Sequence, residues 1–272
     1  MKVITRLSLG LTAGLTFLIG SVLLGTTTAD AKVIQNSFLT TQRTIHTTNS
    51  KKQVQLSLPK GTTVQAAKVK NQAGRKYIYI NAEQLSYRLR KPLLSSKSTS
   101  NFSRWIPVTK ANFKQIKTPV YLSYYNTNVR KKRVNNRYFS TNSNLWQGDT
   151  LPADYASQSG TRLRVTTDGY LEYFAKSPFV YRVSKKPTVT LKVQSATHPG
   201  GSGKDIMIFK SSFSPLPFQK TADSAYTLTI RWLSAATVTA IPNENNVKEL
   251  THQYISKIGD QDWYHRTSTT KF

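Results

Sequence analysis

The chain of 272 residues contains no cysteine. It therefore forms no disulfide bond and offers no thiolate, either as a nucleophile or as a metal ligand. This absence excludes enzymes that work through a cysteine nucleophile. It also excludes a lipid anchor attached to a cysteine.

Acidic residues are scarce. There are 12 of them against 39 lysines and arginines, which gives a formal net charge of +27. Residues 32–150 carry 22 basic and 2 acidic side chains, whereas residues 151–272 carry 15 and 9. Solubility requires only a few net charges, and a large field of one sign attracts polyanions. We therefore expect a polyanionic partner that binds the N-terminal half.

Long hydrophobic runs are confined to the N-terminus. Lys2 and Arg6 precede the apolar run from Leu7 to Leu24, and an A-x-A motif follows at Ala29–Ala31. This order is typical of a secretory signal peptide, so residues 1–31 are predicted to be removed. No later run reaches the roughly 18 apolar residues of a membrane span. We expect a secreted protein with no transmembrane anchor after cleavage.

Motifs for catalysis and cofactor binding are also missing. The four histidines are scattered without metal-ligand spacing, and we interpret them as surface or capping residues. Asp168 and Glu172 are candidates for a glycosidase pair, but Asp168 falls in an expected hairpin turn, which favours solvated side chains. The glycine-rich segment 198–205, HPGGSGKD, departs from the phosphate-loop motif at both ends. The sequence thus predicts no enzyme, no cofactor and no metal site.

Aromatic and β-favouring residues make up much of the rest, with 14 Tyr, 11 Phe and 4 Trp among many Thr, Ser and Asn. Short alternating segments, such as QVQLSL (53–58) and KYIYI (76–80), are separated by Gly and Pro turns and indicate strands. In NAEQLSYRLRKPLL (81–94), Leu85, Tyr87 and Leu89 alternate with polar residues, which predicts a strand with arginines on its open face. The expected fold class is all-β.

The pattern of turns predicts five segments. They are the signal peptide (1–31), a linker (32–49), a first small β-barrel module (50–98), a second module (99–178) and a β-rich C-terminal domain (179–272). Short echoes such as Leu85-Ser86-Tyr87 and Leu122-Ser123-Tyr124 suggest that the second module repeats the first. One short helix is expected near the C-terminus, with Asn246 as its N-cap and Gly259 as its stop signal.

The segments LSLPKGTTVQ and YIYINAEQLSYRLRKPL, with LWQGDTLPA and LRVTTDGYLEYF downstream, carry a resemblance. Roughly residues 50–178 resemble the SH3-like modules of secreted surface proteins from lactic-acid bacteria. The resemblance implies small barrels in an extracellular, wall-associated binding protein. It brings no catalytic motif with it.

Two basic clusters are the candidate binding residues. The first comprises Lys68, Lys70, Arg75, Lys76, Arg88, Arg90 and Lys91; the second comprises Arg130, Lys131, Lys132, Arg133 and Arg137. Guanidinium groups suit phosphate oxygens and lysines supply point charge, while nearby tyrosines would either stack on sugars or fill the core.

We expect a non-covalently wall-associated protein that binds an anionic, teichoic acid-type wall polymer or peptidoglycan. Nucleic acid attracts the same charges, but export argues against it as the natural partner. Two alternatives stay open. The protein would be an adhesin for sulfated host glycans or matrix, or a wall hydrolase whose catalytic domain is residues 179–272.

Overall fold

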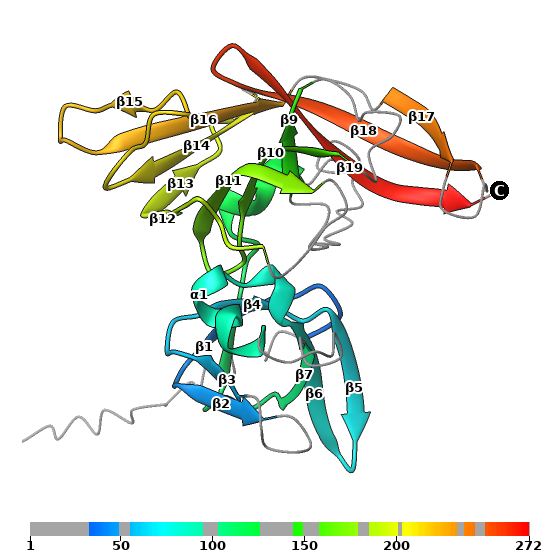
Figure 1. The fold of residues 1–272 in the computed structure, drawn as a ribbon. Coiled ribbons are helices and arrows are strands. Elements are labelled where there is room, and N and C mark those ends of the chain that lie inside the picture. Colours follow the sequence, from blue (N-terminus) through cyan, green and yellow to red (C-terminus); the bar gives the residue numbers. More distant parts are fainter. Residues whose placement is uncertain are drawn as a thin grey trace, which may run out of the picture. The chain divides into compact units, whose positions relative to one another are not determined.

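The computed structural model describes residues 33–48, 55–94, 103–125, 144–148, 158–178, 185–200, 203–232, 237–242 and 248–271 (Figure 1). The predicted signal peptide and the basic cluster at 130–137 lie outside the described residues. The described chain is mostly β-strand, with one short α-helix, which confirms the all-β class. None of its helices is long and apolar enough to cross a membrane.

The strands of the N-terminal part are β1 (Phe38–Thr41), β2 (Ile45–Thr48), β3 (Gln55–Leu58), β4 (Thr63–Gln65), β5 (Lys68–Gln72), β6 (Arg75–Asn81), β7 (Ser103–Pro107) and β8 (Phe113–Ile116). The helices are the 3-10 turns η1 (Ala82–Gln84), η2 (Lys91–Leu93) and η4 (Val120–Tyr125), and α1 (Tyr87–Arg90). The remaining strands are β9 (Asn144–Gln147), β10 (Ser159–Val165), β11 (Tyr170–Pro178), β12 (Val189–Lys192), β13 (Ser195–Thr197), β14 (Lys204–Phe209), β15 (Gln219–Lys220), β16 (Tyr226–Trp232), β17 (Thr237–Pro242), β18 (Lys248–Ile258) and β19 (Gln261–Lys271).

Three small antiparallel sheets build the N-terminal part. Their orders are β4-β1-β8, β2-β3 and β5-β6-β7. Strand alternation sends one set of side chains inward, and these form a common core with residues from the helical turns. The core includes Leu39, Leu56, Leu58, Val64, Ile78, Ile80, Leu85, Leu89, Leu93, Ile106 and Phe113.

One large antiparallel sheet contains every described strand after β8. Its order is β12-β11-β10-β9-β19-β18-β16-β14-β13, with β15 paired to β16 and β17 paired to β18. A second core includes Leu145, Leu163, Leu171, Met207, Leu228, Ile230 and Trp263. Phe38 and Leu122, from earlier in the chain, belong to this core as well.

The sheets cross the segment boundaries predicted from the sequence. β1 and β2 lie within the expected linker, and β7 and β8, beyond residue 98, pair with β6 and β1. β9 to β11 share a single sheet with strands of the expected C-terminal domain. Of these echoes, Leu122-Ser123-Tyr124 lies in the 3-10 helix η4, whereas a third such triplet, Leu171-Glu172-Tyr173, lies in β11.

The segment after Asn81 is helical, so the strand predicted across Leu85–Arg90 is wrong. The Asn81 side chain accepts the Glu83 N–H at 2.9 Å and starts η1, and α1 and η2 follow. Leu85, Leu89 and Leu93 are spaced four residues apart, so helical turns place all three in the N-terminal core. Leucines four residues apart also fit the two-residue period of a strand over a short stretch. This is why the sequence pattern predicted a strand here.

The C-terminal helix predicted from Asn246 to Gly259 is also wrong, because residues 248–258 form β18. This strand pairs along its length with β19, and it also pairs with β17 and β16. Gly259 has a positive φ, as predicted for a stop, but it turns a hairpin rather than ending a helix. Pairing with neighbouring strands satisfies the backbone N–H and C=O groups of this segment. This pairing outweighs the two local helix signals, an N-cap residue and a stop residue.

Candidate ligand-binding surface

The sheet β5-β6-β7 has one face on the N-terminal core and one face outward. A two-residue turn at Ala73-Gly74, both with positive φ, joins β5 to β6 and fixes the register. Lys68 lies opposite Tyr79, and Tyr79 lies opposite Trp105. Ile78, Ile80 and Ile106 point into the core, so their alternating neighbours point away from it.

We call this outward side the cationic aromatic face. It comprises Lys68, Lys70, Arg75, Tyr77, Tyr79 and Trp105. Lys68 and Arg75 are exposed, and Trp105 is 38% exposed, which is high for a residue of this size. A tryptophan kept in solvent on a structured strand gains nothing for the core. Trp105 is not among the binding residues predicted from the sequence, because the two predicted clusters contain cations alone.

Lysines and rings contact one another across this face. The Lys70 Nζ atom lies 4.5 Å from the Trp105 ring centre and 5.7 Å from that of Tyr77. Lys68 Nζ lies 5.4 Å from the Tyr79 ring centre. Tyr79 and Trp105 pack edge to face, with ring centres 5.2 Å apart. Each exposed cation–π contact contributes about 0.5–1 kcal/mol, enough to hold the ammonium groups over the rings.

The cations of this face keep their charge available. Within the described ranges, no carboxylate pairs with Lys68, Lys70 or Arg75. Residues 32–150 contain only two acidic residues, Glu83 and Asp149, so neutralising partners nearby in the sequence are few. A ligand with both negative charge and flat apolar surface would complement this face.

The other predicted binding residues are distributed differently. Lys76 lies on the core-facing side of β6, where its Nζ donates to the Val33 carbonyl at 3.4 Å. Lys91 is exposed in η2, and Arg88 is exposed in α1. Arg130, Lys131, Lys132, Arg133 and Arg137 lie outside the described residues, so their cluster stays a prediction.

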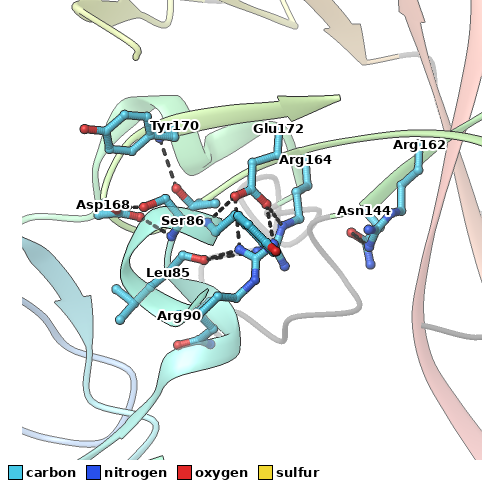
Figure 2. Close-up of polar contacts among 12 residues, drawn as sticks. Leu85, Ser86, Arg90, Asn144, Arg162, Arg164, Asp168, Tyr170 and Glu172 are labelled. Atoms are coloured by element: carbon cyan, nitrogen blue, oxygen red, sulfur yellow. Dashed lines mark hydrogen bonds and ion pairs between the residues drawn. The ribbon is translucent and has the colours of Figure 1, made fainter. Parts of the chain in front are cut away.

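Arg90 is not a surface residue, which corrects its prediction as a ligand contact. It is 1% exposed and forms a two-pronged ion pair with the fully buried Glu172 of β11 (Figure 2). Both Nη–O distances are 3.0 Å. Arg164 of β10 reaches the same carboxylate at 3.0 Å, and both arginines also donate to the Leu85 carbonyl. We call Arg90, Arg164 and Glu172 the buried charge cluster.

Asp168 makes a second link between the same two segments. Its carboxylate accepts the Ser86 N–H at 2.7 Å and the Ser86 hydroxyl at 2.6 Å. The Tyr87 N–H donates to Glu172. The expectation that Asp168 is a solvated turn residue is therefore wrong, although the Asp168-Gly169 hairpin itself is confirmed. Both carboxylates join α1 to the β10-β11 hairpin and are closed to a substrate.

Two histidines occupy environments that the sequence did not predict. His198 Nδ1 lies 2.9 Å from the buried Asp205 carboxylate, and its ring stacks on Trp232 with centres 4.9 Å apart. Burial raises the pKa of Asp205 to about 7, against the opposing effect of His198. His265 is buried, and burial lowers its pKa to about 4. In the part of the chain that the structure describes, no three His, Asp or Glu residues are grouped to hold a metal.

No protein-family model, curated protein or solved structure matches this chain.

Proposed function

We propose that this protein is secreted, associates non-covalently with the cell wall and acts by binding rather than by catalysis. Its ligand is an anionic, teichoic acid-type wall polymer that the cationic aromatic face engages. The observation that carries the proposal is the joint presence of cations, the exposed Trp105 ring and two partly buried tyrosine rings on one face of one sheet. The resemblance of residues 50–178 to SH3-like surface modules agrees with this role.

The chemistry of such a polymer matches the face. Phosphate groups along a chain attract Lys68, Lys70 and Arg75, and their binding releases counterions. Sugar or polyol units between the phosphates present C–H surfaces that pack on Tyr77, Tyr79 and Trp105. The cation–π contacts restrain the lysine side chains before the ligand arrives, so less rotamer entropy is lost on binding.

Binding to purified walls across a salt series tests the proposal. Changing Lys68 and Lys70 together to Gln should weaken binding and flatten the slope of log affinity against log salt by roughly two, one per lost phosphate contact. Trp105→Ala should weaken binding with little change in that slope. Walls stripped of teichoic acid should bind poorly.

The matched control is Lys210→Gln with Lys220→Gln, which removes the same charge from exposed positions outside this face. It should bind almost as the parent protein does. If the control weakens binding as much as the Lys68 and Lys70 variant, net charge alone explains the affinity and the face has no special role. Binding that persists unchanged at high salt in both variants contradicts the electrostatic proposal.

A further inference from the structure

Two further cations, neither of them part of the cationic aromatic face, pack against Tyr170. The Arg88 guanidinium carbon lies 5.7 Å from the centre of the Tyr170 ring, and Lys192 Nζ lies 4.4 Å from it. Arg88 Nη2 also lies 3.4 Å from the Tyr170 hydroxyl. The three residues come from α1, β11 and β12, and only the tertiary structure brings them together.

Among the residues that the structure describes, neither Arg88 nor Lys192 forms an ion pair with a carboxylate. Both Asp168 oxygens accept hydrogen bonds from Ser86, and Lys192 Nζ donates instead to the Asp168 main-chain carbonyl at 2.6 Å. Burial lowers the pKa of Lys192, and although the Asp168 charge opposes this, the charge of Arg88 lowers it further. The folded chain thus keeps two like charges close together, and the negative charge of Asp168 acts on Lys192 without forming an ion pair with it.

The backbone fixes this arrangement. Tyr170 follows Gly169, whose φ is +76°, and the Tyr170 N–H donates to Thr166 Oγ1 at 3.0 Å (Figure 2). A Cβ on Gly169 would lie 3.3 Å from Lys192 Nζ, so the ammonium packs close over the turn. The buried charge cluster and Asp168 hold α1, and therefore Arg88, against the same hairpin. Folding gains nothing from the repulsion between Arg88 and Lys192, whereas a bound anion would remove it.

We propose that Arg88, Lys192 and Tyr170 form a binding site for a single phosphate group, either free or in a phosphodiester. The guanidinium fork matches two phosphate oxygens, the ammonium adds a point charge, and the phenol supplies a further hydroxyl donor. This inference rests on the proposed function only for its class of ligand, because its residues are separate from the cationic aromatic face.

Titration with inorganic phosphate tests the site. The full chain is titrated at constant ionic strength, with chloride as the balancing anion, and binding is followed by phosphorus NMR. Arg88→Gln and Lys192→Gln should each weaken the tightest phosphate binding about tenfold, the effect of one charged hydrogen bond. Lys220→Gln is the control of equal charge change and should leave that binding intact. Arg88→Lys keeps the charge without the fork and should fall between the parent protein and Arg88→Gln.

In the parent protein, lysine side-chain NMR should show the Lys192 pKa rising as phosphate binds. If Arg88→Gln, Lys192→Gln and Lys220→Gln all bind phosphate alike, the site does not exist. Dimethyl phosphate carries the single charge of a phosphodiester and so separates the two sources of the ligand. If it binds tightly, the natural ligand is a phosphodiester linkage of a polymer. If it binds weakly while inorganic phosphate binds tightly, the natural ligand is a free phosphate.

The test is independent of the wall-binding proposal. Trp105→Ala should weaken wall binding yet keep the phosphate site. Phosphate binding that needs Arg88 and Lys192, in a protein that ignores walls, would sustain this inference and overturn the proposed function.

Discussion

Glu172 is a fully buried carboxylate whose two oxygens are both taken by guanidinium groups. Burial by itself would raise its pKa, but Arg164 and Arg90 outweigh that effect, and the pKa lies below its ordinary value. A buried charge of this kind adds little net stability while it is paired, and it costs much when a partner is removed. The cluster links α1 to the β10-β11 hairpin, and its loss would leave buried charges at this junction.

Glu172→Gln should destabilise the protein strongly. It leaves two buried guanidinium groups without their counter-charge, and breaking such a pair costs about 3–5 kcal/mol. Urea denaturation measures the change. Asp260→Asn, at an exposed turn position, is the matched control and should change the free energy of unfolding by less than about 0.5 kcal/mol. If both variants change the free energy of unfolding equally, the charge of Glu172 matters no more to stability than that of an exposed aspartate.

His265 gives the fold a sensitivity to acid. Its folded pKa of about 4 lies below its ordinary value of 6.5, so the unfolded chain binds the proton more readily. Its contribution is fully present above pH 6.5 and is lost as the pH falls toward 4. Between pH 7 and pH 4, the parent protein should lose about 3 kcal/mol relative to His265→Gln, at 1.36 kcal/mol per pKa unit.

Comparing the two proteins isolates His265 from other titrating groups. Asp205 has a raised pKa and acts in the opposite direction, because its contribution is lost as the pH rises from about 4 to about 7. Glu172 has a lowered pKa, so its contribution falls only below about pH 4.5. The contributions of Asp205 and Glu172 to stability are the same in the parent protein and in His265→Gln. Parallel stability curves across pH 4 to 7 would contradict the assignment to His265.

At the scale of elements, the β18-β19 hairpin depends on its turn. Gly259 has a φ of +61°, and a Cβ there would lie 2.7 Å from Pro217 Cγ. An alanine at this position would meet both an unfavourable backbone conformation and a steric clash with a rigid proline ring.

Gly259→Ala should therefore destabilise the protein by about 1–3 kcal/mol, the usual cost of a strained backbone position. The matched control is Gly200→Ala, because Gly200 has no positive φ and open space around its Cα. That change should be close to neutral in thermal or urea unfolding. A neutral Gly259→Ala would mean that the turn adjusts by moving Pro217.

Across the whole molecule, the excess of basic residues makes the charge one-sided. Asp168, Glu172 and Asp205 are at most 6% exposed, and Arg90, Arg104, Arg162 and Arg164 are at most 7% exposed, so burial removes similar numbers of both charges and leaves the excess of 39 basic over 12 acidic residues largely intact. The surface lysines and arginines are left with few acidic neighbours. A field of this sign raises the local concentration of polyanions and weakens steeply with salt. This imbalance supports a polyanionic partner for the protein.

The amino-acid sequence by itself determined the β character of the chain, its positive field and several turns. These depend on local patterns, namely alternation, Gly and Asn at special backbone angles, and simple charge counts. The strand KYIYI and the Asp168-Gly169 hairpin were found this way, and so were Lys68, Lys70 and Arg75 of the cationic aromatic face.

Only the tertiary structure decided which charges face the solvent. Arg88 and Arg90 are two residues apart in one segment, yet one is exposed and the other is buried against Glu172. Glu172 lies 82 positions away from Arg90, and nothing in the local pattern marks their pairing. Tertiary contacts also decided two further features. Pairing with neighbouring strands made residues 248–258 the strand β18 despite local helix signals, and folding brought Lys192 close to Arg88. Contacts between distant segments decide these cases, because burial and pairing outweigh the small energies of local propensity.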